Sequence, residues 1–296
     1  MKLTPQQLAE FDEQGYLFFP NYFSPEETAI LKGSIPEVFA QRREENVREK
    51  TGDVVRTAFA VHTYHPVFEA LVHHPRFVEP AEQLLKDKTY IHQFKINGKA
   101  AFDGDVWQWH QDYGTWKADD GMPQARAMNL AVFVDEVNEF NGPLYFIPRS
   151  HKKGAIEAKH DLTTTSYPLW VIDNDVIAKL VKQGGIVAPK GGPGSAIFFH
   201  GTLVHGSPPN MSPWDRQIIY VTYNSVANGK IFERSPFKHV YVQSAGGDAG
   251  GSIGAAIFGE KRFRIRNGDL VIVRMNFREG EEAVTVATIF HEGRLQ

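Results

Sequence analysis

The sequence predicts a mainly β protein, a sandwich or barrel with flanking helices, and three observations support this. From about Thr89, short runs rich in β-branched and aromatic residues alternate with Gly, Pro and Asn. The preceding residues carry helix signals instead. No helix-length segments alternate regularly with the β runs, which disfavours a doubly wound parallel sheet. We therefore expect one domain over residues 1–244, with a helical part at 1–88 and a β core at 89–244.

Two helices are expected near the N-terminus. Thr4 is a suitable N-cap before a proline in the first turn, and Gly15 is suited to end that helix. Ser24 and Glu27 have the spacing of a capping box, again with a proline in the first turn. Both patterns predict helix starts and carry no functional information.

The predicted strands of the core are separated by turn residues and one long connection. Residues 159–185 form this connection, which has room for one helix, and such connections are often lids or substrate loops. Residues 245–296 are expected to be a Gly-rich linker and a β-hairpin tail, because Asn267 and Gly268 between two β runs are a strong hairpin signal. The predicted strands lie in TYIHQFKIN, RAMNLAVFVDEV, GPLYFIP, GSAIFFH and RQIIYVTYNSV.

The composition excludes several classes of function. A net charge of -3 gives no basic field for a phosphate backbone, so we expect a small-molecule partner and no nucleic acid. No window approaches the roughly 18 consecutive apolar residues of a membrane span, and no secretion signal is visible. We therefore expect no membrane partner and a cytoplasmic location. The chain has no cysteine, so any metal must be bound by histidine and carboxylate side chains.

The motif His110-Gln111-Asp112 is a candidate for metal binding. On a strand, residues two apart point to the same side, so His110 and Asp112 could reach one ion while Gln111 points away. Non-haem iron oxygenases use two histidines and one carboxylate on one face of the metal. The third ligand should then be a distant histidine on another strand, and His205, which follows an apolar run, fits this place.

A dicarboxylate co-substrate chelating such a metal needs a bidentate cation for its far carboxylate, and a guanidinium supplies that fork. Arg216 follows His205 after a turn and a strand start, which favours it over Arg149 and Arg126.

Other interpretations remain open at this point. The remaining histidines in the candidate region, His62, His151 and His200, are expected to make ordinary hydrogen bonds. A zinc hydrolase could also use two histidines and a carboxylate, although Arg216 would then have no evident task. A binding barrel without catalysis would need no intact triad.

Five blocks of the sequence, in this order, resemble the phytanoyl-CoA dioxygenase family of Fe(II)- and 2-oxoglutarate-dependent oxygenases, and within it the ectoine hydroxylases. The resemblance implies a double-stranded β-helix, a jelly-roll or cupin-like barrel with the iron at its mouth. It also implies hydroxylation that consumes O2 and releases succinate and CO2. The blocks are RTAFAVH (56–62), YIHQFKIN (90–97), WHQDYGTWKADDGMP (109–123), NGPLYFIPRSH (141–151) and HGSPPNMSPWDR with YNSVAN (205–216 and 223–228).

The resemblance assigns site residues position by position. It places the metal and catalytic triad at His110, Asp112 and His205. The other positions that it implies are Arg216, Gln93, Ser207 and Lys95 for 2-oxoglutarate, and Thr115, Trp116 and Gln93 for the substrate.

Departures from the ectoine hydroxylase pattern predict a different substrate. Lys95 stands where an arginine is usual, Tyr113 and Gly114 replace phenylalanine and glutamate, and the Pro-Arg-Pro-Glu-Phe segment is missing. We expect a small polar or zwitterionic metabolite, such as an amino acid, an ectoine-like compound or a quaternary ammonium compound that Trp107, Trp109 or Trp116 could face. The same iron chemistry ending in desaturation, epoxidation or cyclisation of a natural-product intermediate is the alternative. The resemblance is also compatible with a homodimer.

Overall fold

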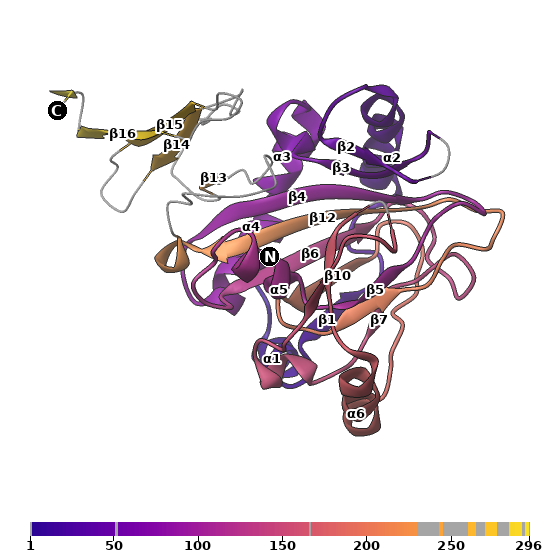
Figure 1. Ribbon diagram of the computed structural model, residues 1–296. Helices are drawn as coiled ribbons and strands as arrows, with labels where there is room; N and C mark the ends of the chain where they lie inside the picture. The colour runs from indigo at the N-terminus through magenta and orange to yellow at the C-terminus, as the bar shows by residue number, and fades with distance from the viewer. Residues whose placement is uncertain are drawn as a thin grey trace.

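The structure is a computed structural model of the chain (Figure 1). It contains two antiparallel sheets whose inner faces pack together, with helices covering the outer face of the larger sheet. This is the jelly-roll architecture that the sequence predicts, so the fold class is confirmed. The residues that the structure describes are 2–50, 53–165, 167–229, 243–244, 260–264, 270–276, 284–291 and 294–295.

The larger sheet contains the predicted apolar strands at its centre. Its order is β1-β10-β6-β12-β4-β3-β2, and β13 also pairs with β4. The central strand β6 is buried along its whole length, as expected for a strand that is covered on both faces. The bounds are β1 (Tyr16–Phe19), β10 (Ala196–His200), β6 (Ala127–Phe133), β12 (Arg216–Ser225), β4 (Thr89–Lys99), β3 (Val55–Phe59), β2 (Asn46–Arg48) and β13 (Gln243–Ser244).

The second sheet is built from short strands in the order β7-β11-β5-β9-β8. Its middle strands β11 and β5 begin or end at His205 and His110, so the smaller sheet carries both predicted histidine ligands. A core of aromatic and aliphatic side chains from both sheets fills the space between them, with Phe146 from the smaller sheet meeting Phe199 from the larger one. The bounds are β7 (Tyr145–Phe146), β11 (His205–Ser207), β5 (Trp107–His110), β9 (Leu169–Val171) and β8 (Lys159–Asp161).

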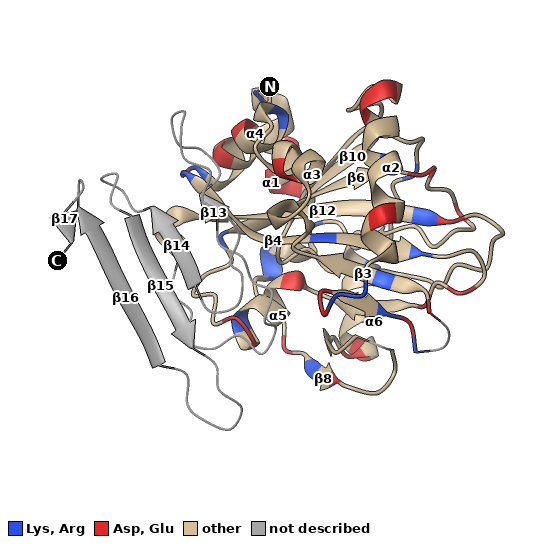
Figure 2. Ribbon diagram, turned by 90° about the horizontal axis from the view of Figure 1, so that it is seen from above, with Lys and Arg blue, Asp and Glu red and all other residues tan. Residues whose placement is uncertain are grey.

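Helices pack on the outer face of the larger sheet, mainly through α2, α3 and α4 (Figure 1). Acidic and basic residues are interspersed along the helices and loops (Figure 2). None of the helices in the described ranges is both long and apolar enough to cross a membrane. The bounds are α1 (Pro5–Gln14), α2 (Pro25–Ala40), η1 (Val61–Thr63), α3 (Pro66–Val72), α4 (Pro75–Leu85), α5 (Asp112–Ala118), η2 (Ser150–Lys153), α6 (Asn174–Gly184) and η3 (Val226–Asn228).

The N-terminal part at 1–88 is less purely helical than the sequence predicts. Thr4 and Ser24 are the helix N-caps, as predicted, and a capping box forms at each of them, although the sequence indicated one only at Ser24. However, β1 pairs with β10 and β3 pairs with β4, so this part also completes the larger sheet. The difference arises because these short strands are specified by pairing with distant strands, and short apolar runs do not reveal such pairing.

The C-terminal strands form a third sheet of their own, in the order β14-β15-β16-β17. Arg264 lies opposite Leu270 in the antiparallel pair of β14 and β15, on either side of the predicted Asn267-Gly268 turn. That turn and the Gly-rich linker lie outside the described residues. The bounds are β14 (Glu260–Arg264), β15 (Leu270–Asn276), β16 (Val284–His291) and β17 (Arg294–Leu295).

The capping box at Ser24 gives a test of the helix starts. The Glu27 amide donates to Ser24 Oγ at 3.2 Å, and the Ser24 amide donates to the Glu27 carboxylate at 2.9 Å. We expect Ser24→Ala to lower the free energy of unfolding by about 1 kcal/mol, measured by urea denaturation. Ser34→Ala in the same helix is the matched control, and it should change stability little because a helix-interior serine is not a cap. Equal effects of the two substitutions would contradict the capping role.

Candidate metal centre

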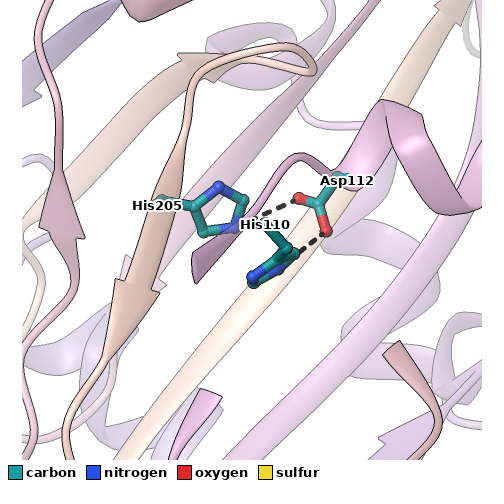
Figure 3. A group of neighbouring side chains, drawn as sticks. All are labelled: His110, Asp112 and His205. Carbon is teal, nitrogen blue, oxygen red and sulfur yellow. Dashed lines mark ion pairs between the residues drawn. The ribbon is translucent and has the colours of Figure 1, made fainter. Parts of the chain in front are cut away.

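His110, Asp112 and His205 lie together and point toward one another (Figure 3). One ligand atom from each lies within 4.8 Å of the others, and all three side chains are buried. His110 ends β5 and His205 begins β11, and the two residues face each other in the antiparallel register. The structure therefore brings together the three residues that the sequence analysis singled out for metal binding.

Asp112 reaches this cluster by a different route from the one expected. It does not lie on a strand with His110, because β5 ends at His110 and Asp112 is the first residue of α5. Gln111 between them does point away: its amide donates to the carbonyls of Gly154 and Thr202, at 2.9 and 2.6 Å. These bonds hold the strand-to-helix bend, so that Asp112 turns back toward the end of β5.

The hydrogen bonds of the two histidines fix which ring nitrogen faces the cluster. His110 Nδ1 donates to the Gln108 carbonyl at 2.6 Å, and His205 Nδ1 donates to the Leu203 carbonyl at 2.9 Å. Each Nε2 is then left as a lone-pair donor, 3.7 and 3.6 Å from the Asp112 carboxylate. Metal-binding histidines are oriented by such bonds from the second ring nitrogen.

Neighbouring groups keep Asp112 ionised in a buried place. Burial alone would raise the pKa of Asp112, but Lys95, His205 and His110 together hold it below its usual range. Lys95 Nζ lies 3.6 Å from Asp112 Oδ1. Asn129 in β6 donates to Asp112 Oδ2 at 2.6 Å, which fixes the orientation of the carboxylate. The acidic ligand is thus charged and oriented without a metal ion.

His205 is also held in the form that a metal needs. Burial lowers the pKa of His205 to about 3, with a further contribution from His110, so its imidazole is neutral near pH 7. Two imidazoles and one carboxylate on one side of a barrel fit a divalent transition metal with open positions on its other side. The donor set therefore fits Fe(II).

A cavity next to the triad holds buried donors that have no partner among the described residues. Arg216 is 1% exposed, and its Nε and Nη1 have no hydrogen-bond acceptor there; the same holds for Ser207 Oγ. Burial lowers the pKa of Arg216, while Tyr220 opposes the shift. A buried guanidinium without a carboxylate leaves a place for an anion. The lining residues are Lys95, Asn97, Trp107, His110, Asp112, Leu144, His205, Gly206, Ser207, Arg216 and Tyr220.

The two other arginines considered as partners of the co-substrate carboxylate make different contacts. Arg149 lies outside this cavity and donates to the Gln183 carbonyl at the surface. Arg126 donates to the Leu85 carbonyl and forms an ion pair with Asp87.

The other histidines of the candidate region also lie outside the triad. His151 bonds to the Asp12 carbonyl and His200 to Thr202, while His62 packs against Phe94.

Three predicted contact residues do not line this cavity: Gln93, Thr115 and Trp116. Gln93 is half-buried on β4. Thr115 Oγ1 is buried in α5 and has no partner among the described residues. Trp116 is 1% exposed and packs edge-on against His92. Their roles as substrate contacts stay predictions.

The tryptophans near the triad are used partly by the protein itself. The guanidinium of Arg56 lies over the Trp107 ring, 4.0 Å from its centre, so one face of this indole is already occupied by a cation. Trp109 packs with residues of α6 and lies beside Tyr145. Of the two, only Trp107 lines the cavity.

Sequence reasoning missed Asn97 and Tyr220, which also line the cavity. A signal for both was present in the strand alternation. Asn97 is two residues from Lys95 on β4, and Tyr220 is four residues from Arg216 on β12, so each lies on the same face as a predicted residue.

A comparison with protein families agrees with this site. The model of the family described as phytanoyl-CoA dioxygenase matches residues 11–218, which hold the triad and Arg216. The chain belongs to the phytanoyl-CoA dioxygenase family. It is an Fe(II)- and 2-oxoglutarate-dependent dioxygenase, as the resemblance implied. A second model, carbamoyltransferase N-terminus, matches residues 220–257, which begin within β12 of the barrel.

Relatives with known names support the same class. The ectoine dioxygenase of Bordetella bronchiseptica is 35% identical over 236 residues, covering 76% of this chain and 77% of that protein. The L-proline trans-4-hydroxylase of Streptomyces griseoviridis is 33% identical over 228 residues, covering 74% and 85%. The crystal structure of EctD from S. alaskensis with 2-oxoglutarate and 5-hydroxyectoine has a TM-score of 0.69 at 35% identity, covering 76% and 77%.

Removing the bond that orients Asp112 should weaken metal binding. Asn129 also accepts a hydrogen bond from Thr222 Oγ1 at 2.6 Å, so its side chain is fixed from both ends. We expect Asn129→Ala to raise the Kd for Fe(II) by about 10- to 100-fold, measured anaerobically by competition with a chromophoric chelator. Thr222→Val should act in the same direction but less strongly. An unchanged Kd in a folded Asn129→Ala protein would remove Asn129 from the support of the site.

Proposed function

We propose that this enzyme hydroxylates an unactivated C–H bond of a small polar or zwitterionic metabolite, with Fe(II) held by His110, Asp112 and His205. The observation that carries the proposal is a buried triad beside a buried arginine that has no carboxylate partner in the described part of the chain. A zinc hydrolase gives that arginine no task, and a binding barrel without catalysis would need no intact triad. A dicarboxylate co-substrate would supply the carboxylate partner that the Arg216 guanidinium lacks.

In this proposal Arg216 and Ser207 hold the far carboxylate of 2-oxoglutarate. Both line the cavity, and their donor atoms that have no partner in the described ranges match the acceptors of a carboxylate. Lys95, which lines the same cavity, adds a positive charge for an anionic ligand. When bound, Fe(II) with 2-oxoglutarate and O2 supplies the oxidation that replaces C–H by C–OH, releasing succinate and CO2.

The remaining residues act by position and by excluding water. Asn129 and Lys95 keep the Asp112 carboxylate charged and in one orientation. The carbonyls of Gln108 and Leu203 keep both histidines in the tautomer that presents Nε2. These contacts within the protein fix the orientation of the donor atoms, which limits the reorganisation that binding of the metal and co-substrate requires.

Two considerations favour a small polar substrate over a CoA thioester. The similar proteins described above are named for ectoine and L-proline, which are small and zwitterionic. In this chain, Gln93 is half-buried on the same face of β4 as Lys95, and Thr115 contributes a buried hydroxyl from the helix that begins at Asp112. The presence of Lys95 and the missing Pro-Arg-Pro-Glu-Phe segment favour a substrate other than ectoine.

Co-substrate binding can be tested before the substrate is known. Anaerobic addition of 2-oxoglutarate to the Fe(II) protein should produce a weak visible charge-transfer band, and Asp112→Ala should lose it. Arg216→Lys keeps a charge but not the planar fork, so we expect its Kd for 2-oxoglutarate to rise about 10-fold or more. Arg149→Lys is the matched control and should bind like the wild type. No band in an iron-loaded wild-type protein would refute the assignment of the triad.

The substrate class can be tested by succinate release. Amino acids, cyclic zwitterions and quaternary ammonium compounds should include one that stimulates succinate formation, coupled to a product with one added oxygen atom. Products that have lost two hydrogen atoms or closed a ring would show desaturation or cyclisation instead, and an epoxide product would also exclude hydroxylation. Stimulation by acyl-CoA thioesters alone would contradict the proposed substrate class.

A further inference from the structure

Lys99 is a fully buried lysine that the proposed mechanism does not use. It is the last residue of β4, is 0% exposed and lies opposite Arg216 in the register of β4 and β12. It does not line the cavity beside the metal triad. Burial lowers its pKa well below the usual range; the nearby cations Arg216 and Arg56 add to this shift, and the carboxylates of Glu49 and Asp105 oppose it. Such an unfavourable position calls for a structural or functional reason.

The Lys99 ammonium connects two loops. It donates to the carbonyl of Pro208 at 2.7 Å and to the carbonyl of Asp105. No carboxylate in the described ranges lies at ion-pair distance from it. Pro208 directly follows β11, and Asp105 lies just before β5. A single side chain of the larger sheet therefore holds both middle strands of the smaller sheet.

Lys99 holds β11 and β5 at one end of this strand pair, and that end lies at the same side of the cavity as Arg216. Ser207 and Trp107 are the cavity residues nearest to the two bonded carbonyls along the chain, and they face each other in the register of β11 and β5. His110 and His205 lie at the other end of the same strand pair. The clamp thus acts on the place assigned to the far carboxylate of 2-oxoglutarate, beyond the metal ligands.

The loops are shaped to admit the lysine stem. A Cβ added at Gly142 would lie 2.8 Å from both Lys99 Cδ and the Pro208 carbonyl oxygen that Lys99 binds, and one added at Gly104 would lie 2.7 Å from Lys99 Cβ. Gly142 also has a φ of +76°, which L side chains rarely adopt. Gly142 precedes Leu144, which lines the cavity, so a third loop packs on the same side chain.

We propose that Lys99 is a positioning residue for the co-substrate: by binding the carbonyls of Pro208 and Asp105 it holds Ser207 and Trp107 against Arg216 in the arrangement that 2-oxoglutarate needs. This inference rests on the proposed function, because it assigns the Arg216 end of the cavity to 2-oxoglutarate. It predicts a selective effect. Loss of the clamp weakens 2-oxoglutarate binding and leaves Fe(II) binding almost unchanged.

Lys99→Met is the first variant, because it keeps the length of the stem and removes the ammonium. We expect the Kd for 2-oxoglutarate, from anaerobic titration of the charge-transfer band, to rise about 10-fold or more. The Kd for Fe(II), from chelator competition, should change less than about 3-fold. Tyr223→Phe is the matched control. It removes a buried hydrogen bond from β12 to the Val72 carbonyl, on the helix-covered side of the sheet, and should alter neither Kd.

Gly142→Ala is the second variant, which keeps the ammonium but places a methyl group where the lysine stem lies. It should reproduce the selective loss of 2-oxoglutarate binding. A Kd for 2-oxoglutarate as in the Tyr223→Phe protein, or equal losses for Fe(II) and 2-oxoglutarate, would overturn the positioning role and leave the proposed function intact. A wild-type protein that binds Fe(II) but gives no band would instead overturn the proposed function, and this inference with it.

Discussion

The burial of a charged carboxylate at Asp112 is the constraint on which the rest of the site depends. An ionised carboxylate away from water must be compensated, and here Lys95 lies at ion-pair distance and Asn129 donates a hydrogen bond, while two histidines lie beside it. Each of these groups comes from a different element of the barrel or its loops. The double-stranded β-helix is what brings them to one point, since β4, β5, β6 and β11 all pass beside the start of α5.

Cations, by contrast, lie at the end of the cavity that we propose for the co-substrate. Arg216 and Lys99 are buried side by side in paired strands, and Arg56 is close enough to lower the pKa of both. A cluster of buried cations is unfavourable unless an anion completes it or backbone carbonyls accept its hydrogen bonds. Lys99 uses carbonyls, whereas Arg216 keeps donors that have no partner in the described ranges. In our proposals, this difference separates the supporting cation, Lys99, from the cation that binds the co-substrate, Arg216.

Much of the site could be predicted from the sequence because its signals are local. His110 and Asp112 are two residues apart, and the lack of cysteine left only histidine and carboxylate as metal ligands. The order of His205, turn and Arg216 follows from one strand leading into the next. Asn129 and Lys99 could not be found in this way, because Asn129 orients Asp112 and Lys99 binds the Pro208 carbonyl, and both partners are distant in the chain. The bend after His110 was missed too, since Gln111 holds it through distant carbonyls.

The sequence by itself determined the class of fold, the candidate metal triad and the family, because periodicity, residue type and motif order are properties of the linear chain. The tertiary structure alone decided which tautomers the histidines adopt, which cations are buried and which of them keep unused donors. These depend on pairing between strands distant in sequence and on the low polarity of the space between two sheets. A polar group loses its contact with water only when the fold encloses it. The energetic cost of this desolvation therefore cannot be predicted from neighbouring residues in the sequence.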